Sequence, residues 1–219
     1  IGAALRARGH DVVVCAPADL CGFVRHAGLS AVPLPVSAQE VLNSDEGKRL
    51  LAGGHLGGFL RMLRNAVRGK EDAVTDALVA AADGADVLAA APLCLGPAMM
   101  LAEARRVPLV PVYLQPVVPT SAFPSPVLDV GSLGPLNWWT HRLFETVFWR
   151  AGGDDTARFA ARVGVAAPTE NLVVAARNLP SLHTYSPVVV PKPSDWPASH
   201  RLTGMVGLSS STRAAVGES

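Results

Sequence analysis

The chain has 219 residues, of which 49% are hydrophobic, and its 19 basic and 18 acidic side chains give a formal net charge of +1. The length suits one large α/β domain, and the hydrophobic content excludes a globally disordered protein. No dense run of Lys or Arg is present, so the charge gives no sign of a nucleic-acid partner.

Cysteine usage and hydropathy favour a cytoplasmic protein. Cys15, Cys21 and Cys94 are odd in number and form no CxxC pair, which argues against a disulfide framework. The longest uncharged stretch, residues 87–102, is interrupted by prolines and a glycine and falls short of the roughly 18 to 20 apolar residues of a spanning helix. At most a peripheral membrane contact is expected. Richness in Ala, Arg, Gly, Val and Pro fits a GC-rich, actinobacterial genome.

The opening stretch "IGAALRARGHDVVVCAP" predicts a helix, a turn at Gly9, a strand over residues 12–15 and a new helix. A second helix over 20–27 ends at Gly28, and "LSAVPLP" is a short strand. This is the alternation of a parallel sheet with crossover helices. Since such a unit normally begins with a strand, a first strand is expected before Ile1.

The middle of the chain continues the alternation. Residues 36–58 are glycine-rich and of mixed polarity, which predicts a loop with a short helix. Helical spacing from Leu56 to Ala81 predicts a long helix with a break near Gly69. "ADVLAAAP" is predicted to be a buried strand, and residues 96–106 the helix that follows it.

The last third begins with a predicted strand over residues 109–113, whose prolines must occupy positions that need no amide donor. "VVPTSAFPSP" is a proline-rich irregular loop, and residues 136–163 are helical with a break at 152–153. "NLVVAA" and "HRLTGMV" are predicted to be the last strands, and the polar tail, residues 208–219, a linker.

The predicted fold class is therefore α/β, a Rossmann-like parallel sheet flanked by helices. Residues 12–15, 86–90 and 109–113 are expected to be buried parallel strands of one sheet. In such sheets ligands bind beyond the carboxyl ends of the strands. The loops at that edge are predicted to begin at Pro17, Pro33, Pro92 and Gln115.

Four stretches in order resemble the N-terminal, acceptor-binding domain of GT-B glycosyltransferases of the UDP-glycosyltransferase superfamily, in the branch of bacterial antibiotic and sterol glucosyltransferases. They cover nearly the whole chain except residues 36–58. They are "GAALRARGHDVVVCAP" with "FVRHAGLSAVPLP", "ADVLAAAPLCLGPAMMLAEARRVPLVPVYLQPVVPTSAFPSP", "NWWTHRLFETVFWRAGGDDTARFAARVGV", and "LHTYSPVVVPKPSDWPASHRLTGMVGL". The resemblance implies that residues 1–207 are this domain, incomplete at its start, with 208–219 leading to a C-terminal nucleotide-sugar domain.

The resemblance also implies an inverting transfer of a sugar from a nucleotide diphosphate to a hydroxyl of a hydrophobic acceptor. The catalytic base of the family, a His or an Asp, would precede Ile1, so no catalytic residue is assigned here. The nucleotide-sugar donor would be held mainly by the C-terminal domain, and no cofactor or metal is implied. On this basis the chain alone is expected to transfer no sugar. The alternative is a non-catalytic module that binds a lipid or polyketide, or an auxiliary subunit of a transferase.

The resemblance points to acceptor-binding residues in the loops after two strands and on one helix. Some plant members carry an Asp after the strand matching residues 86–90; here Pro92 and Leu93 stand there, so that role is not carried over. Trp139, Leu143 and Val147 have the spacing of a core-facing stripe, and most aromatic residues of the helix are expected to lie in the core. Trp138 and Phe144 are the two expected in a pocket or in an exposed apolar patch. The predicted acceptor-binding residues are Leu93, Gln115, Thr120, Phe123, Trp138 and Phe144.

The remaining reactive side chains carry weaker signals. The histidines are scattered without metal-ligand spacing, and His55, in the glycine-rich segment, could overhang a cleft. His10 is best explained as a turn residue. Cys94 follows a strand, but no neighbouring group in the sequence would activate its thiol.

Overall fold

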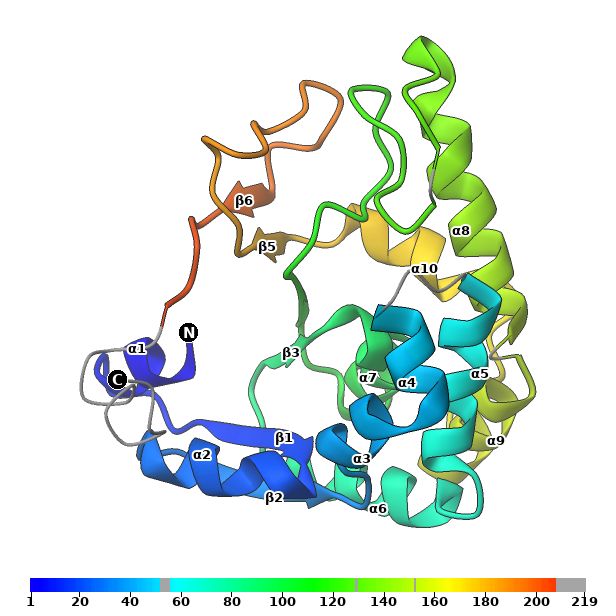
Figure 1. Cartoon of the computed structure of the whole chain (residues 1–219). Coiled ribbons are helices and arrows are strands. Elements are labelled where there is room, and N and C mark those ends of the chain that lie inside the picture. The colour runs from blue at the N-terminus through cyan, green and yellow to red at the C-terminus, as the bar shows by residue number, and fades with distance from the viewer. Residues whose placement is uncertain (52–55, 129, 152, 208–219) are drawn as a thin grey trace. The chain divides into compact units, whose positions relative to one another are not determined.

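The computed structural model describes residues 1–51, 56–128, 130–151 and 153–207. The chain divides into two units, residues 1–83 and 84–206 (Figure 1). Each unit is an α/β arrangement with its own parallel sheet. His55 and the predicted linker, residues 208–219, lie outside the described residues.

The first unit alternates helices and strands as the sequence predicts, and then becomes wholly helical. Its elements are α1 (Gly2–Arg6), β1 (Val13–Pro17), the 3-10 turn η1 (Ala18–Leu20), α2 (Cys21–His26), β2 (Ser30–Leu34), α3 (Ala38–Asn43), α4 (Asp45–Leu51), α5 (Leu56–Val67) and α6 (Glu71–Ala81). Residues 36–51 are more helical than predicted, because Ser37 caps α3 by accepting a hydrogen bond from the Glu40 amide.

The sheet of the first unit pairs β1 with β2 in parallel, from Val13 opposite Ser30 to Pro17 opposite Leu34. α2 packs on it through a small core of Ala16, Cys21 and Val24. Gly28 ends α2 with a φ of 76°, a left-handed conformation that explains why glycine stands there. Gly69, with a φ of 73°, likewise separates α5 from α6 at the predicted break.

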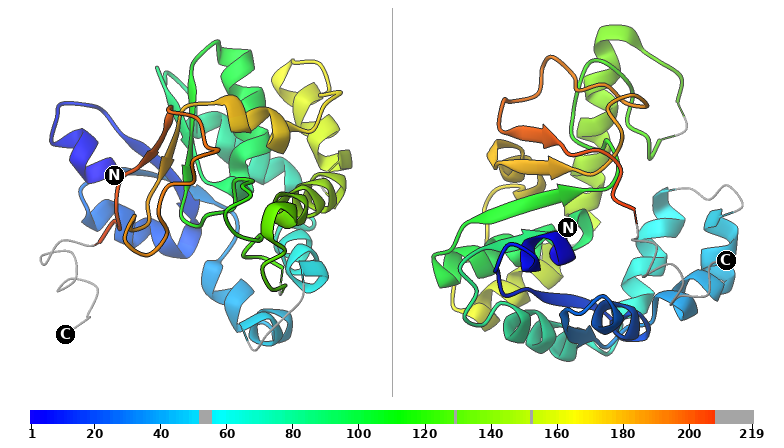
Figure 2. Two further views of the ribbon diagram at one scale, coloured as in Figure 1. Left: turned by 90° about the horizontal axis from the view of Figure 1, so that it is seen from above. Right: turned by 90° about the vertical axis from the view of Figure 1, so that its left-hand side faces the viewer.

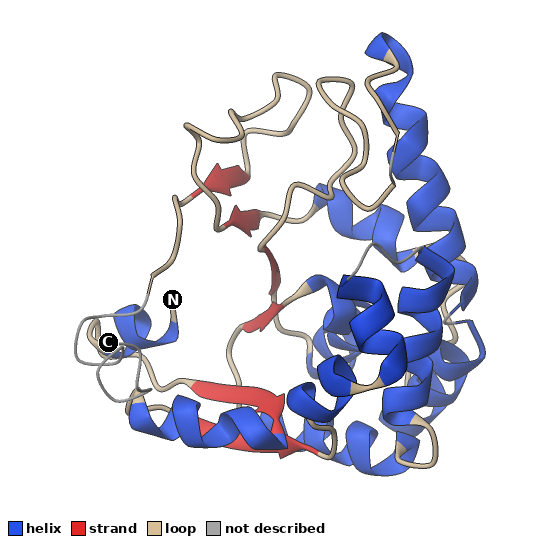
Figure 3. Ribbon diagram, in the orientation of Figure 1, coloured by secondary structure: helices blue, strands red, loops and turns tan. Residues whose placement is uncertain are grey.

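The second unit carries a four-stranded parallel sheet and the longest helix (Figure 3). Its elements are β3 (Leu88–Ala90), η2 (Pro92–Cys94), α7 (Leu95–Arg105), β4 (Leu109–Tyr113), η3 (Gly134–Leu136), α8 (Asn137–Ala151), α9 (Gly153–Val163), α10 (Leu172–Ala175), η4 (Ala176–Asn178), β5 (Ser181–His183) and β6 (His200–Leu202).

β4 is the strand that holds this sheet together. Its first half pairs with β3, from Leu109 opposite Leu88, and its last two residues pair with β5. β6 then continues the sheet beyond β5 in the order β3-β4-β5-β6 (Figure 2). α7 covers the β3–β4 end through a core that includes Leu95, Leu109 and Ala176.

Three sequence predictions are corrected here. Residues 12–15 do not share a sheet with the strands at 86–90 and 109–113, because β1 pairs with β2 and the described residues contain no strand that joins the two sheets. β1 is also only partly buried, with Val13 exposed. "NLVVAA" is helical, because the Asn171 side chain accepts hydrogen bonds from the amides of Val173 and Val174 and so starts α10.

The core under α7 gives a test of this packing. Leu95 is buried among Ala90, Leu109 and Ala176, so Leu95→Ala should lower the free energy of unfolding by about 2–5 kcal/mol through lost burial and a cavity. Urea unfolding measures this. Leu93→Ala is the control, because Leu93 is 52% exposed two residues away. An equal loss in both variants would contradict the assigned core.

Candidate functional site

The buried face of α8 is polar. Asn137, Thr140, His141 and Glu145 follow helical spacing, and all four are buried. The apolar stripe lies on the other side of the helix. Trp139 is 63% and Leu143 57% exposed, so the prediction that these two belong to the core is wrong. Polar side chains replace apolar ones on the inward face because each finds hydrogen-bond partners there.

Asn137 and Thr140 fasten the loop that follows β4 to the start of α8. The Asn137 amide nitrogen donates to the Ser121 carbonyl at 3.1 Å, and its oxygen accepts from the Leu133 amide at 2.7 Å. Thr140 Oγ1 accepts from the Ser125 amide at 2.7 Å. The loop is therefore irregular but held by defined bonds.

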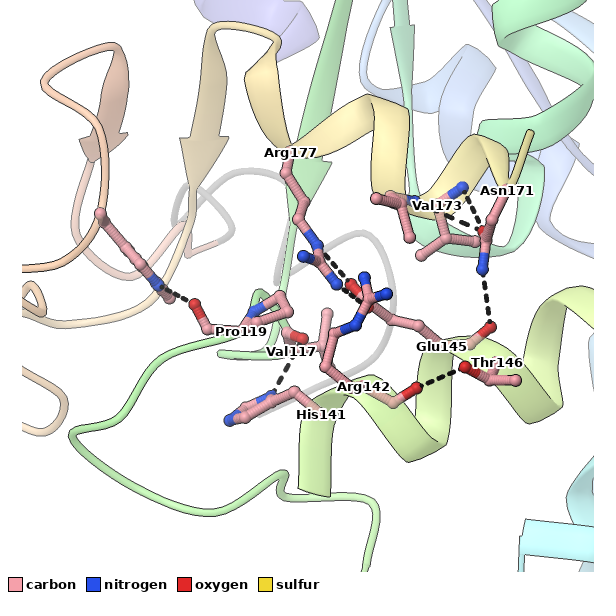
Figure 4. A network of polar contacts seen from close by, with 11 residues as sticks. Val117, Pro119, His141, Arg142, Glu145, Thr146, Asn171, Val173 and Arg177 are labelled. Atoms are coloured by element: carbon pink, nitrogen blue, oxygen red, sulfur yellow. Dashed lines mark hydrogen bonds and ion pairs between the residues drawn. The ribbon is translucent and has the colours of Figure 1, made fainter. Parts of the chain in front are cut away.

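His141 reaches into the same loop, as Figure 4 shows for its contact with Val117. Its Nδ1 lies 3.3 Å from the Val117 carbonyl oxygen and its Nε2 3.1 Å from that of Phe123. Burial lowers the pKa of His141 more than these two carbonyls raise it. A neutral imidazole donates one N–H, so only one of the two contacts is a hydrogen bond at a time.

Asp195 holds the same loop through its carboxylate. Its carboxylate accepts from Thr120 Oγ1 at 2.7 Å and from the amide and hydroxyl of Ser121 at 2.8 and 3.0 Å. Burial would raise the pKa of Asp195, but these hydrogen bonds together hold it below the ordinary value. The neighbouring Trp196 indole donates to the Pro119 carbonyl at 3.0 Å.

Two guanidinium groups gather around the buried carboxylate of Glu145 (Figure 4). Arg177 binds it through Nε, at 2.8 Å, and through Nη2. Arg142 Nη1 lies 3.7 Å from the same carboxylate. Both guanidinium carbons also lie over the Trp138 ring, at 5.3 Å for Arg142 and 5.9 Å for Arg177. The Asn171 side chain adds a 3.4 Å bond to the Glu145 carbonyl.

His183 is the centre of an aromatic stack at the carboxyl ends of β4 and β5. Its ring lies 4.4 Å from Trp196 and 5.0 Å from Tyr113, and 5.3 Å from His200. Burial, with smaller contributions from His200 and Lys192, lowers the pKa of His183 to about 4. The imidazole is therefore neutral at pH 7 and packs as an aromatic ring.

Ser181, His183 and Tyr185 form a chain of hydrogen bonds, each 3.1 Å long, through the two ring nitrogens of His183. A serine hydrogen-bonded to a histidine resembles an activated serine nucleophile, but all three residues are buried and Ser181 has almost no exposed surface. A nucleophile needs access to its substrate. The set is accordingly structural, and it gives both ring nitrogens of a core histidine a hydrogen-bond partner.

The predicted acceptor residues separate into three groups. Leu93 and Gln115 follow β3 and β4 at the carboxyl edge of the sheet, and both are exposed. Thr120 is buried and bonded to Asp195, while Phe123 packs against the Tyr113–Trp196 core and the edge of His141. Trp138 and Phe144 are half-buried on α8. Their role in binding an acceptor stays a prediction.

Four polar residues that organise this region were not predicted: Arg142, Glu145, Arg177 and Asp195. Glu145 could have been singled out from the sequence, because it is the one acidic residue in the aromatic-rich helix α8. Asp195 and Arg177 lie in short segments without periodicity, and only the fold brings them to their partners.

Other reactive groups in the described residues have ordinary roles. Burial raises the pKa of the Cys94 thiol, which disfavours a reactive thiolate. No cluster of three or more His, Cys, Asp or Glu residues in that part of the chain is placed to hold a metal. Among the described helices, none is both long and apolar enough to cross a membrane.

Comparisons with known proteins agree with the resemblance seen in the sequence. No protein-family model matches the chain. It is 30% identical over 217 residues to an O-mycaminosyltylonolide 6-deoxyallosyltransferase of Streptomyces fradiae, which covers 93% of the chain and 49% of the relative. It is 28% identical over 205 residues to a sterol 3-beta-glucosyltransferase of Cryptococcus neoformans, covering 91% of the chain and 12% of the relative.

Solved structures with the same fold are also glycosyltransferases. CalG4, the calicheamicin glycosyltransferase, matches with a TM-score of 0.55 at 13% identity, over 94% of this chain and 46% of that one. The glycosyltransferase of kitacinnamycin matches with a TM-score of 0.52 at 18% identity, over 94% and 47%. The chain thus spans about half the length of these GT-B structures and half or less of its curated relatives, consistent with an N-terminal domain.

The buried histidines predict how stability depends on pH. Because the folded-state pKa of His183 is depressed from 6.5 to about 4, its contribution is complete above pH 6.5 and is lost as the pH falls toward 4. Between pH 7.5 and 5 this loss is about 2 kcal/mol for His183 alone. His141 and His200, whose pKa values are also lowered, act in the same direction.

Urea unfolding at the two pH values measures this effect. His183→Gln, which cannot titrate, should reduce the difference in free energy of unfolding by about 2 kcal/mol. His26→Gln, at an exposed histidine at the end of α2, is the control for replacing an imidazole outside the core. An unchanged pH difference in His183→Gln would contradict a neutral buried imidazole.

Proposed function

We propose that the chain is the acceptor-binding half of an inverting glycosyltransferase that moves a sugar from a nucleotide diphosphate sugar to a hydroxyl of a hydrophobic acceptor. The observation that carries the proposal is the similarity of 93% of the chain to a deoxyallosyltransferase whose acceptor is a tylonolide derivative. The similarity to sterol glucosyltransferases supports the same acceptor class, since sterols and macrolides are both large, mostly apolar alcohols.

The outward face of α8 supports a hydrophobic acceptor. Trp139 and Leu143 are both more than half exposed and lie four residues apart, so they form one apolar stripe on the helix, and the exposed Leu136 lies just before it in η3. Water contact with so large an apolar surface is unfavourable, and such stripes commonly mark binding sites. The polar inward face holds this stripe and the loop after β4 in fixed positions.

The role proposed for these residues is to bind and orient, not to react. A hydroxyl must be held in line with the anomeric carbon for displacement to occur, and positioning of this kind supplies a large part of catalysis. The aromatic and aliphatic side chains of α8 would bury the apolar body of the acceptor. The exposed Gln115, two residues beyond the end of β4, is suited to donate a hydrogen bond to one of the acceptor's oxygens.

Binding of a macrolide lactone to the chain tests the proposal. Trp139→Ala should weaken binding by about 1–2 kcal/mol, roughly five- to thirtyfold, because one large apolar contact is lost. Its melting temperature should change little, since the side chain is mostly exposed. Titration calorimetry gives the affinity and a thermal melt the stability. Met205→Ala, at another strongly exposed apolar residue, is the control.

A second variant separates binding from stability. Phe123 packs against the buried cluster of Tyr113, Val118, Tyr185 and Trp196, so Phe123→Ala should lower the melting temperature. If Trp139→Ala binds the lactone as tightly as the parent chain, α8 is not the acceptor surface. If the parent chain binds neither a macrolide nor a sterol, the acceptor class itself is wrong.

A further inference from the structure

The cluster around Glu145 has more positive than negative charge. Glu145 supplies one carboxylate, and Arg142 and Arg177 supply two guanidinium groups. Arg177 occupies the carboxylate with its two-pronged contact. These side chains are far from fully solvated: that of Arg142 is 33% exposed, that of Arg177 20% and that of Glu145 3%. Partly buried charge of this kind is costly without a counter-ion.

Arg142 contributes most of the unused hydrogen-bonding capacity. Its nearest carboxylate oxygen, at 3.7 Å, is beyond hydrogen-bond distance, and its guanidinium has no hydrogen-bond acceptor within the described residues. Nη1 of Arg177 and the indole N–H of Trp138 likewise have no acceptor among the side chains and carbonyls that the structure describes. A guanidinium presents five N–H donors in a planar fork that matches carboxylate and phosphate oxygens.

Among the described residues that lie nearby, none neutralises the surplus. Burial keeps His141 uncharged by lowering its pKa, and it raises the pKa of Tyr113 to about 12, so neither carries charge at pH 7. The Asp195 carboxylate is engaged by Thr120 and Ser121. The pKa of Arg177 reflects this surplus. Burial and, secondly, the positive charge of the nearby Arg142 lower it to about 10.

We propose that Arg142, Arg177 and Trp138 form a binding site for an oxyanion, a carboxylate or a phosphate group, carried by a small ligand. Glu145 fixes Arg177, and the Trp138 ring keeps the two guanidinium groups together through its face (Figure 4 shows the two guanidinium groups beside Glu145). The ligand oxygens would accept hydrogen bonds from Arg142 and from Nη1 of Arg177. This site does not depend on the proposed sugar transfer.

Titration calorimetry with three probes tests the site. The probes are 2-naphthoate, inorganic phosphate, and 2-naphthalenemethanol as the uncharged relative of naphthoate. At least one anion should bind the full chain, and binding should weaken as salt is added. Arg142→Gln should weaken that binding tenfold or more, because it removes a charged, two-pronged donor. Arg142→Lys keeps the charge but not the planar fork of N–H donors. Its affinity for the anion should lie between that of the parent chain and that of Arg142→Gln.

Arg150→Gln is the matched control, because Arg150 lies on the same helix and the substitution changes the net charge equally. Binding of phosphate alone supports the site and identifies a phosphate ligand, while preferential binding of naphthoate identifies a carboxylate beside an aromatic body. Four results would overturn the proposal. These are no binding of either anion, equal binding of the uncharged alcohol, parent-like affinity in Arg142→Gln, or equal losses in Arg142→Gln and Arg150→Gln. Thermal melts of the variants confirm that each is folded.

Discussion

The carboxylate of Glu145 is buried in the middle of α8, and its neutralisation links several elements of the second unit. A buried carboxylate is tolerated when a partner charge and hydrogen bonds replace its water shell. Arg177 supplies both from the short helical segment before β5, and Asn171 adds a bond to the Glu145 carbonyl. The Arg177 carbonyl in turn accepts from His200 in β6, at 2.9 Å. The ion pair and this hydrogen bond together connect the long helix to β6, at the edge of the sheet.

The same constraint explains why α8 presents its apolar side outward. Asn137, Thr140 and His141 precede Glu145 on one face, and each of them binds backbone of the loop after β4. With the inward face committed to polar contacts, the positions on the opposite side of the helix have no core to join. Trp139 and Leu143 are consequently exposed. A helix that packs by hydrogen bonds thus retains an exposed apolar surface.

Much of the fold could be predicted from periodicity and glycine positions. The strands at 109–113 and 200–202, and the break at Gly69, follow directly from local pattern. Two kinds of error remain, and each has a physical cause. "NLVVAA" has strand-like residues, but the cap at Asn171 makes it helical. The apolar stripe of α8 was predicted to face the core. Periodicity alone does not show that the polar stripe of the same helix finds buried hydrogen-bond partners and faces inward instead.

The site was less predictable than the fold, because its key contacts join segments far apart in sequence. Asp195 binds Thr120 across 75 positions and Arg177 binds Glu145 across 32. Composition misleads in a related way. A net charge of +1 excludes a field suited to nucleic acid, but it averages over the whole chain. Two guanidinium groups around one buried carboxylate create a local surplus that no sum over the sequence detects. Because burial weakens solvent screening, the interaction between those charges is stronger than it would be between the same groups in water.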